Sequence, residues 1–347
     1  MNILIENDIF ENANTHDEQL ELLHLLYLIW DRHRYTLMLN ADVQNCQSIK
    51  DWSDNDKEIL NGCFIKSVVE SLNADCIISK DGTNIYDEKI FTTAEGVKYL
   101  SQPLSIIVEN SLNDAHFVRA IMRCYDSSGI LLVHDQEYWL KFENAGGCTN
   151  VINFIEGCIN QYGKPKFLKC FVLLDGDKYY AGETQTKYDT LKEKLDSWNI
   201  NYHILEKRCM ENYMPVRAIP DTQTSHQWKL AYMSLSPKQR DFINIGEGFY
   251  GDLTVCQKQE LADKEKLKGG IIRFFRNGDI EDFYSSVSDG NFNHLCRGIG
   301  ISNYKTEFPK YFDDTDNVNK IAFDELTAHQ ENRNELKDIV VTLRSLI

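Results

Sequence analysis

Two apolar segments of the sequence end in carboxylates that could bind a metal ion. Ile106-Ile107-Val108 runs directly into Glu109, and the segment from Leu168 to Leu174 runs into Asp175-Gly176-Asp177. If both are parallel strands of one sheet, their carboxyl ends lie at the edge where open α/β sheets bind ligands. Alternate residues of an extended segment point the same way, so Asp175 and Asp177 are expected to converge. Three such carboxylates favour Mg²⁺ or Mn²⁺, ions that promote the hydrolysis of phosphate esters.

The Asp-x-Asp pattern is not specific on its own. It also occurs in glycosyltransferases and in phosphatases of the haloacid dehalogenase type. Those phosphatases carry Thr or Val two residues after the second aspartate, where this chain has Tyr179. A helix cap or a surface turn explains an acid at the end of a strand equally well. The order of the surrounding elements therefore decides what the acids indicate.

The residues around the acids alternate between strand and helix patterns. Such alternation predicts βαβ units and a largely parallel sheet. The strand candidates are continuous apolar runs, which are typical of strands buried on both faces. We expect strands at Leu104–Glu109, Ile130–Val133, Tyr138–Phe142, Leu168–Leu174 and Tyr202–Leu205, and helices over Ala115–Cys124, from Val151, and over Thr184–Trp198.

The chain of 347 residues is expected to contain three regions: 1–100, 101–215 and 216–347. The first is predicted to be mostly helical, with short β-like pieces at Cys76–Ser79 and Lys89–Phe91. The last is also predicted to be mostly helical, over Thr254–Lys268 and Phe323–Ile347. No apolar window of about 18 residues is present, so no membrane-spanning helix is expected. The first residues do not resemble a signal peptide, and a cytoplasmic location is expected.

The acids occur in an order that resembles the Toprim domain, which is shared by topoisomerases, bacterial primases and nucleases of the OLD (overcoming lysogenization defect) family. Glu109 comes first, Gly146-Gly147 follows, and then comes Asp175-Gly176-Asp177. The segment Leu205-Glu206-Lys207-Arg208-Cys209-Met210-Glu211-Asn212-Tyr213 is similar to one in Toprim nucleases of bacterial anti-phage defence. The resemblance covers residues 101–215 and implies an α/β fold with a central parallel sheet flanked by helices.

The resemblance also implies roles for individual residues. Glu109 matches a metal ligand or general base, and Asp175 and Asp177 match the Asp-x-Asp metal ligands. Glu211 matches the acid of the Glu-Asn-Tyr segment. The family's second acid would fall at Asn113, and Asp114 one residue further on is the candidate metal ligand.

Two of these assignments have alternatives. Asp114 also fits the N-cap of the helix predicted from Ala115, and the departure at Asn113 bears on whether one or two metal ions act. Related nucleases stabilise the transition state with a lysine. Lys207 and Lys238 are both candidates, and their spacing does not separate them.

The function implied by the resemblance is a Mg²⁺- or Mn²⁺-dependent endonuclease that cleaves DNA or tRNA-like structured RNA. OLD-type nucleases usually carry an ATPase domain on the same chain, but this sequence has no Gly-x-x-x-x-Gly-Lys-Ser/Thr loop. A separate ATPase partner is therefore expected, with the chain as an effector of phage defence and with homodimerisation possible. The alternatives are a non-catalytic binding module and, ranked lower, a primase-type nucleotidyltransferase.

Net charge and cysteine spacing argue against some other classes of protein. The net charge of −16 argues against a simple high-affinity nucleic-acid binder, which draws on Lys and Arg. One basic stretch, 264–276, interleaves cations with aromatic residues and could bind nucleic acid, although a core strand with solvated cations explains it as well. The ten cysteines form no Cys-x-x-Cys pair, so we expect reduced, mostly buried thiols.

Overall fold

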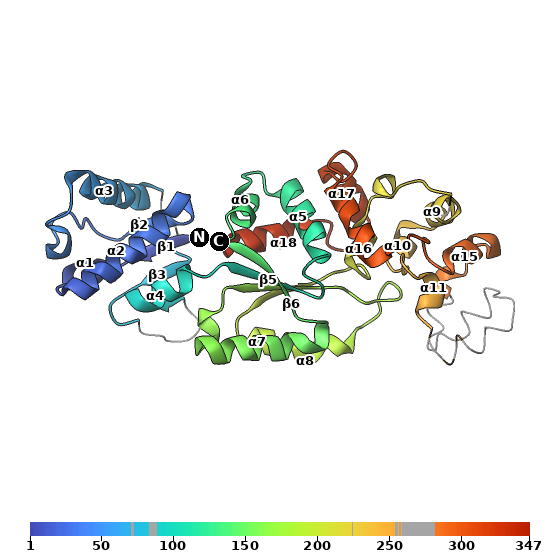
Figure 1. The fold of residues 1–347 in the computed structure, drawn as a ribbon, viewed down its shortest axis with the longest axis horizontal. Coiled ribbons are helices and arrows are strands. Elements are labelled where there is room, and N and C mark those ends of the chain that lie inside the picture. Colours follow the sequence, from blue (N-terminus) through green and yellow to red (C-terminus); the bar gives the residue numbers. More distant parts are fainter. Residues whose placement is uncertain (71–72, 83–88, 224, 254–255, 257, 259–281) are drawn as a thin grey trace.

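The computed structural model describes residues 1–70, 73–82, 89–223, 225–253, 256, 258 and 282–347. It is an elongated molecule with an α/β unit at one end, a second α/β unit in the middle and a group of helices at the other end (Figure 1). Among the described residues, no helix combines the length and apolar character needed to cross a membrane.

The N-terminal unit is built on a four-stranded parallel sheet with the strand order β2-β1-β3-β4. Helices make up most of this region, as expected, but strands β1 and β2 are not among the elements predicted from the sequence. Ile3 and Ile5 of β1 are completely buried in the core of this unit. Its elements are β1 (Asn2–Ile5), α1 (Asn7–Asn12), α2 (His16–Trp30), β2 (Thr36–Leu39), α3 (Asp54–Val69), β3 (Cys76–Ile78), β4 (Ile90–Phe91) and α4 (Thr93–Leu100).

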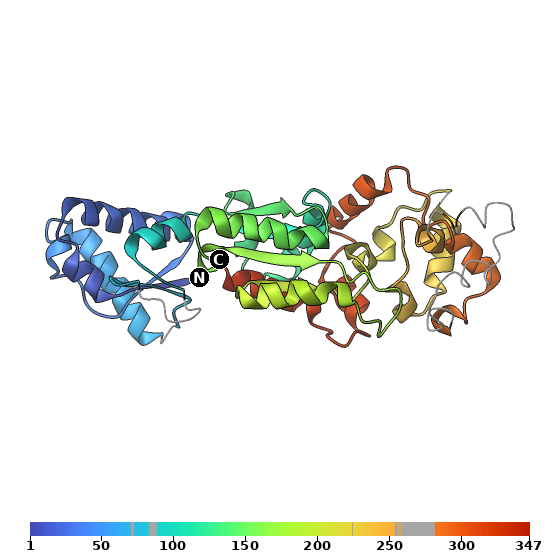
Figure 2. The same ribbon diagram turned by 90° about the horizontal axis from the view of Figure 1, so that it is seen from below.

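The middle unit contains a second four-stranded parallel sheet with the order β6-β5-β7-β8, which confirms the expected α/β class with a parallel sheet. Helices α5, α6 and α18 cover one face, and α7 and α8 cover the other (Figures 1 and 2). Its elements are β5 (Leu104–Val108), α5 (Asp114–Tyr125), α6 (Ile130–Gln136), β6 (Leu140–Asn144), α7 (Cys148–Tyr162), β7 (Cys170–Leu174), α8 (Asp189–Ser197) and β8 (Asn201–Ile204).

Alternation along the central strands buries both faces of this sheet. Ile106 and Phe171 pack into the core beneath α5, whereas Ile107 and Val172 pack into the core beneath α7 and α8. All four side chains are at most 2% exposed. This two-sided burial explains why the strands read as continuous apolar runs.

Two of the predicted elements in this unit differ in the structure. The strand predicted at Ile130–Val133 is wrong, because these residues begin helix α6. The helix predicted over Thr184–Trp198 is shorter, with a 3₁₀ turn, η4 (Thr186–Tyr188), before α8. In α6 only Leu131 and His134 are buried, while Ile130 and Val133 are half exposed, which is a helical spacing.

Helices make up most of the described part of the C-terminal region, as predicted. Helix α18 packs against α5 and α6, so one hydrophobic core continues from the middle sheet into residues beyond 215. The predicted boundary near residue 215 therefore does not separate two cores. The helices are α9 (Ser225–Met233), α10 (Pro237–Arg240), α11 (Gly248–Gly251), α15 (Asp289–Leu295), α16 (Tyr304–Glu307), α17 (Lys320–Thr327) and α18 (Glu335–Ser345), with 3₁₀ turns η5 (Met210–Tyr213), η6 (Val216–Ala218) and η7 (Phe308–Asp313).

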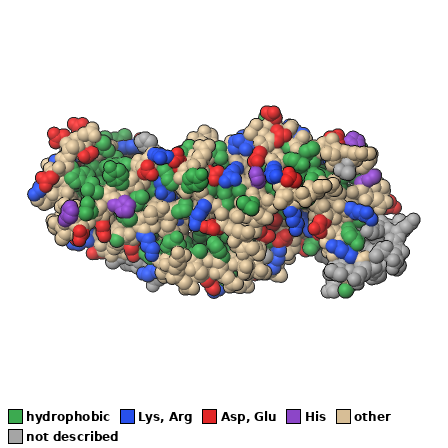
Figure 3. Space-filling view, viewed as in Figure 1, with side chains coloured by type: hydrophobic (Ala, Val, Ile, Leu, Met, Phe, Trp, Pro, Cys, Tyr) green, Lys and Arg blue, Asp and Glu red, His purple; other side chains and the backbone are tan. Residues whose placement is uncertain are grey.

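Two predictions for this region have different outcomes. The segment Phe323–Ile347, which is predicted to be helical, contains most of α17 and all of α18. The helix predicted over Thr254–Lys268 and the basic stretch 264–276 lie almost wholly outside the described residues. On the face shown in Figure 3, acidic and basic side chains are interspersed.

Candidate active site

The acids predicted from the sequence lie where the strand order of the middle sheet reverses. The chain passes from β5 outward to β6 on one side, and then returns to β7 on the other side of β5. The pairing of Ile107 with Val172 places the carboxyl ends of both strands at one edge. Glu109 and Asp175 follow these strands immediately. Open α/β sheets bind ligands at such a switch point.

Gly176 holds the turn between the two aspartates close to a neighbouring loop. A Cβ atom at this position would lie 2.2 Å from the Lys207 carbonyl oxygen and 2.4 Å from that of Leu205. Only glycine fits there without moving the backbone. The next residue, Asp177, has a φ of 51°, and its amide donates to the Arg208 carbonyl at 2.7 Å. The segment therefore does not continue as the extended strand expected from the sequence, and Asp177 is aimed by a left-handed turn instead.

Hydrogen bonds fix the positions of three of the acids. Asp175 Oδ1 accepts from the amide of Met210 at 3.0 Å, which ties the segment containing Glu211 to the end of β7. Asp114 Oδ2 accepts from the Asn110 amide at 2.8 Å. Asp177 Oδ2 accepts from Lys187 and, at 2.9 Å, from the Tyr188 hydroxyl.

The start of helix α5 shows which of the two predicted roles of Asp114, helix N-cap or metal ligand, fits its position. Its N-cap is Asn113, and Asp114 is the first helical residue. The Asp114 carboxylate closes the loop from Asn110 rather than capping its own helix. Asp114 thus lies at the first position of α5, one residue after the position at which the resemblance places the family's second acid.

The acids repel one another electrostatically. Burial raises the pKa of Asp175 well above its usual value, and the charges of Glu211, Asp114, Glu109 and Asp177 raise it further. Burial also raises the pKa of Asp114 to about 7, with added contributions from Glu211 and Glu109. The structure therefore gathers five predicted acids from three segments of the chain into one negative cluster.

One carboxylate oxygen of Glu109, Oε1, is buried without a hydrogen-bond partner among the described residues. Burial raises the pKa of Glu109, Asp177 raises it further, and Lys187 opposes the effect. A buried carboxylate oxygen without a partner is costly, and a catalytic role, a bound ion or a bound water explains such groups.

These residues fit a magnesium ion in donor chemistry. Among the described residues, no three His, Cys, Asp or Glu side chains are arranged to hold one ion together. Mg²⁺ usually takes one or two carboxylates and completes its shell with water and substrate phosphate, so a three-residue protein cage is not required. The unpartnered Glu109 oxygen and the mutual repulsion of the acids both favour a bound cation at this edge.

The raised carboxylate pKa values predict that the metal-free protein loses stability as the pH rises. The pKa of Asp114 is about 7 in the folded protein, whereas the ordinary pKa of an aspartate side chain is 3.8. Between these values the unfolded chain releases the proton and the folded chain keeps it, so unfolding becomes more favourable. In EDTA, we therefore expect the melting temperature to decrease as the pH is raised from about 4 to about 7, because of the Asp114 carboxylate.

An Asp114→Asn variant tests this origin. It is expected to flatten the fall in melting temperature and to be more stable than the wild type near neutral pH. Added Mg²⁺ is expected to raise the melting temperature of the wild type more at pH 8 than at pH 6, because deprotonated acids bind it better. An identical pH profile in the variant would show that Asp114 does not carry the effect.

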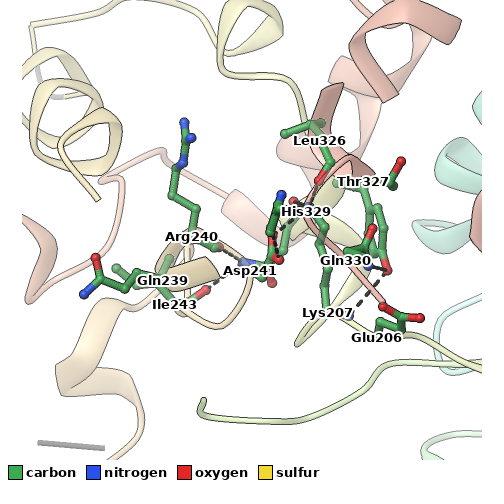
Figure 4. A network of polar contacts seen from close by, with 12 residues as sticks. Glu206, Lys207, Gln239, Arg240, Asp241, Ile243, Leu326, Thr327, His329 and Gln330 are labelled. Carbon is green, nitrogen blue, oxygen red and sulfur yellow. Dashed lines mark hydrogen bonds and ion pairs between the residues drawn. The ribbon is translucent and has the colours of Figure 1, made fainter. Parts of the chain in front are cut away.

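Neither lysine candidate pairs with an acid of the cluster within the part of the chain that the structure describes. Lys207 is 1% exposed and pairs with Asp241 at 2.8 Å, and the other oxygen of Asp241 accepts from His329 at 2.6 Å (Figure 4). Lys238 is exposed at the end of α10. Lys187 is the cation that pairs with an acid of the cluster, Asp177. Sequence reasoning missed it, because its position depends on the path of the loop from 177 to 188.

The Glu-Asn-Tyr segment joins the sheet to the C-terminal helices. The side-chain amide of Asn212 donates to the carbonyls of Arg240 and Ile243 at 2.9 and 3.0 Å. The Tyr213 hydroxyl donates to the buried Glu335 at the start of α18. Asn212 and Tyr213 thus fix the loop to the C-terminal region, while Glu211 adds its charge to the acid cluster.

Four predicted acids, Glu109, Asp114, Asp177 and Glu211, therefore interact electrostatically with Asp175 at the switch point of a parallel sheet, and Lys187 pairs with Asp177. A negative, half-buried cluster of this kind is suited to holding divalent cations against phosphate oxygens. Comparisons with protein-family models, with curated proteins and with solved structures found no match to this chain.

Proposed function

We propose that the chain is a metal-dependent nuclease that hydrolyses phosphodiester bonds in DNA or structured RNA. The observation that carries this proposal is that acids from separate segments interact electrostatically at the switch point, while a buried Glu109 oxygen has no hydrogen-bond partner among the described residues. Buried like charges cost free energy, and perturbed acids gathered at a ligand-binding edge are typical of functional sites.

In this proposal one or two of the carboxylates of Glu109, Asp114, Asp175 and Asp177 would bind each Mg²⁺ or Mn²⁺ ion directly, and the others would act through its water ligands. When bound, such an ion supplies activation of water and neutralisation of the charge that develops on the phosphate. The protein contributes the position of the acids: Gly176 keeps the Asp175–Asp177 turn close to the Lys207 loop, and Met210 fixes the Asp175 carboxylate. Lys187, beside Asp177, places a positive charge at the same edge, where it would stabilise negative charge on the phosphate.

A second function is favoured by one feature of the site. Asp177 is already neutralised by Lys187 and held by Tyr188, as in a fold retained for docking rather than catalysis. A module of this kind would bind its partner without requiring a divalent ion. The resemblance to OLD-type nucleases would make a separate ATPase the partner in either case.

The test is cleavage of supercoiled plasmid and of total tRNA by the purified protein with Mg²⁺, with Mn²⁺ and with EDTA. We expect cleavage of at least one substrate with a metal ion and none in EDTA. The assay is repeated in the presence of the cell's soluble extract lacking this protein, because an effector controlled by an ATPase can be silent alone. Metal-independent cleavage would contradict the proposed chemistry, and absence of cleavage under every condition would favour the docking module.

A further inference from the structure

A cavity of about 450 Å³ in the C-terminal half of the chain is lined by three cations and one acid. Arg217 lies on η6, Lys229 on α9, and Arg240 at the end of α10, with Glu325 of α17 as the acidic lining residue. The rest of the lining is largely apolar and includes Val216, Met233 and Leu326. The cavity is separate from the acid cluster described above, and its net positive lining contrasts with the chain's net charge of −16.

The positive charge of the cavity is not compensated by ion pairs within the described part of the chain. Lys229 Nζ donates to the Ile219 carbonyl at 2.8 Å, and Arg217 Nε donates to the Asn317 carbonyl at 3.0 Å. Both acceptors are neutral, so they position the cations without cancelling their charge. Figure 4 shows the Arg240 side chain extending away from the Lys207–Asp241–His329 network.

The cavity is mechanically tied to the acid cluster. The Arg240 carbonyl accepts from the side-chain amide of Asn212, the residue after Glu211. The same 3₁₀ turn begins at Met210, whose amide binds Asp175. A ligand bound by Arg240 would therefore contact a residue that is hydrogen-bonded to the segment that positions the acids.

A phosphate group is the ligand that this chemistry favours. Arginine presents planar donors that match phosphate oxygens, and lysine adds a point charge. The apolar lining offers contact surface for a sugar or a base, while Glu325 keeps the cavity from being uniformly positive. On a strongly acidic chain, a local group of cations is also what a polyanion needs to approach the surface.

We propose that this cavity binds a backbone phosphate of the nucleic-acid substrate, at a distance from the scissile bond. The inference rests on the proposed nuclease function and names a second contact for the same substrate. Lys229 and Arg240 carry the binding, with Arg217 at the rim.

Binding is measured by fluorescence anisotropy in EDTA, with a labelled short DNA duplex and with labelled tRNA, as the NaCl concentration is raised. The test variant is Lys229→Gln/Arg240→Gln. The control is Arg32→Gln/Lys57→Gln, which removes one arginine and one lysine from the N-terminal unit. We expect the test variant to bind about tenfold more weakly near 100 mM salt and to lose about one to two from the slope of log K against log salt. The control is expected to match the wild type.

A second variant with the opposite expected effect on affinity distinguishes loss of binding from a folding defect in the test variant. Glu325→Gln removes the acidic lining residue and is expected to raise affinity by about two- to fivefold. Unchanged affinity in both cavity variants, or an equal loss in the control, would overturn the proposal. So would a wild-type protein that binds neither nucleic acid in EDTA. The binding assay contains no metal ion, so it tests the cavity independently of cleavage. If nucleic acid binds through the cavity but is never cleaved, the cavity proposal stands and the proposed nuclease function is refuted.

Discussion

Replacing Asp175 and Asp177 together with alanine is expected to lower metal-dependent cleavage by at least about 10²-fold while the protein stays folded. Losing a residue that only orients a metal ligand typically costs 10- to 100-fold in affinity or activity, so losing two candidate ligands should cost at least as much. Asp175 also interacts electrostatically with all the other acids of the cluster, which makes it the most sensitive position. The measurement is the initial rate of plasmid or tRNA cleavage at saturating Mg²⁺.

The same change is expected to affect stability very little. The variant loses the hydrogen bond from the Met210 amide to Asp175 Oδ1, which costs about 1 kcal/mol, and the half-exposed contacts of Asp177 with Lys187 and Tyr188. It also relieves repulsion among buried acids. Chemical unfolding in EDTA compares it with the wild type. Glu58→Ala/Glu193→Ala, which removes two exposed acids from α3 and α8, is the charge-matched control and is expected to keep full activity. Full activity in the Asp175/Asp177 variant would mean that the active site lies elsewhere.

The acids could be predicted from the sequence because topology alone brings them together. Glu109 and Asp175 each follow a continuous apolar run, and parallel strands place their carboxyl ends at one edge. Lys187 could not be predicted, because a loop rather than a strand delivers it to Asp177. The same limit applies to Lys207: its place in the sequence suggests proximity to the acids, but its side chain points into a pair with Asp241.

The errors in the predicted secondary structure occurred at short apolar runs of the sequence. The run beginning at Ile130 has the composition of a strand, but Gly129, with a φ of 70°, starts a helix in which only every third or fourth residue is buried. Four-residue runs do not distinguish these cases, whereas the longer β7 run does. Strands β1 and β2 were missed for the same reason, since each has only four residues.

The two sheets share one strand order, a relation that no sequence repeat reveals. In both, the first strand is flanked by the second and third, and a fourth lies beyond the third. Glu6-Asn7 follows β1 as Glu109-Asn110 follows β5, but Ser79-Lys80 follows β3 where Asp175-Gly176 follows β7. The N-terminal unit thus repeats the architecture of the middle unit without its full set of acids, which is consistent with chemistry confined to the middle unit.

Lys207→Met is expected to destabilise the fold by about 3–5 kcal/mol, because it leaves the charge of Asp241 buried without its partner. The side chains of Lys207 and Asp241 are only 1% and 7% exposed, and Lys207 also donates to the Leu326 carbonyl at 3.0 Å. Lys187→Met is the matched control. Its pair with Asp177 is about 39% exposed, so its loss should cost less than about 1 kcal/mol. Urea unfolding at constant pH measures both.

The pair of lysine variants also separates a structural from a catalytic role for Lys207. If Lys207 acts through the fold, Lys207→Met/Asp241→Leu should recover part of the lost stability, since an apolar pair replaces an uncompensated charge. The folded fraction of Lys207→Met should then cleave at the wild-type rate, whereas Lys187→Met should cleave more slowly at full stability. Lost cleavage with unchanged stability in Lys207→Met would instead support the transition-state lysine that the resemblance implies. That outcome would require the side chain to leave Asp241 and turn toward the acids when substrate binds.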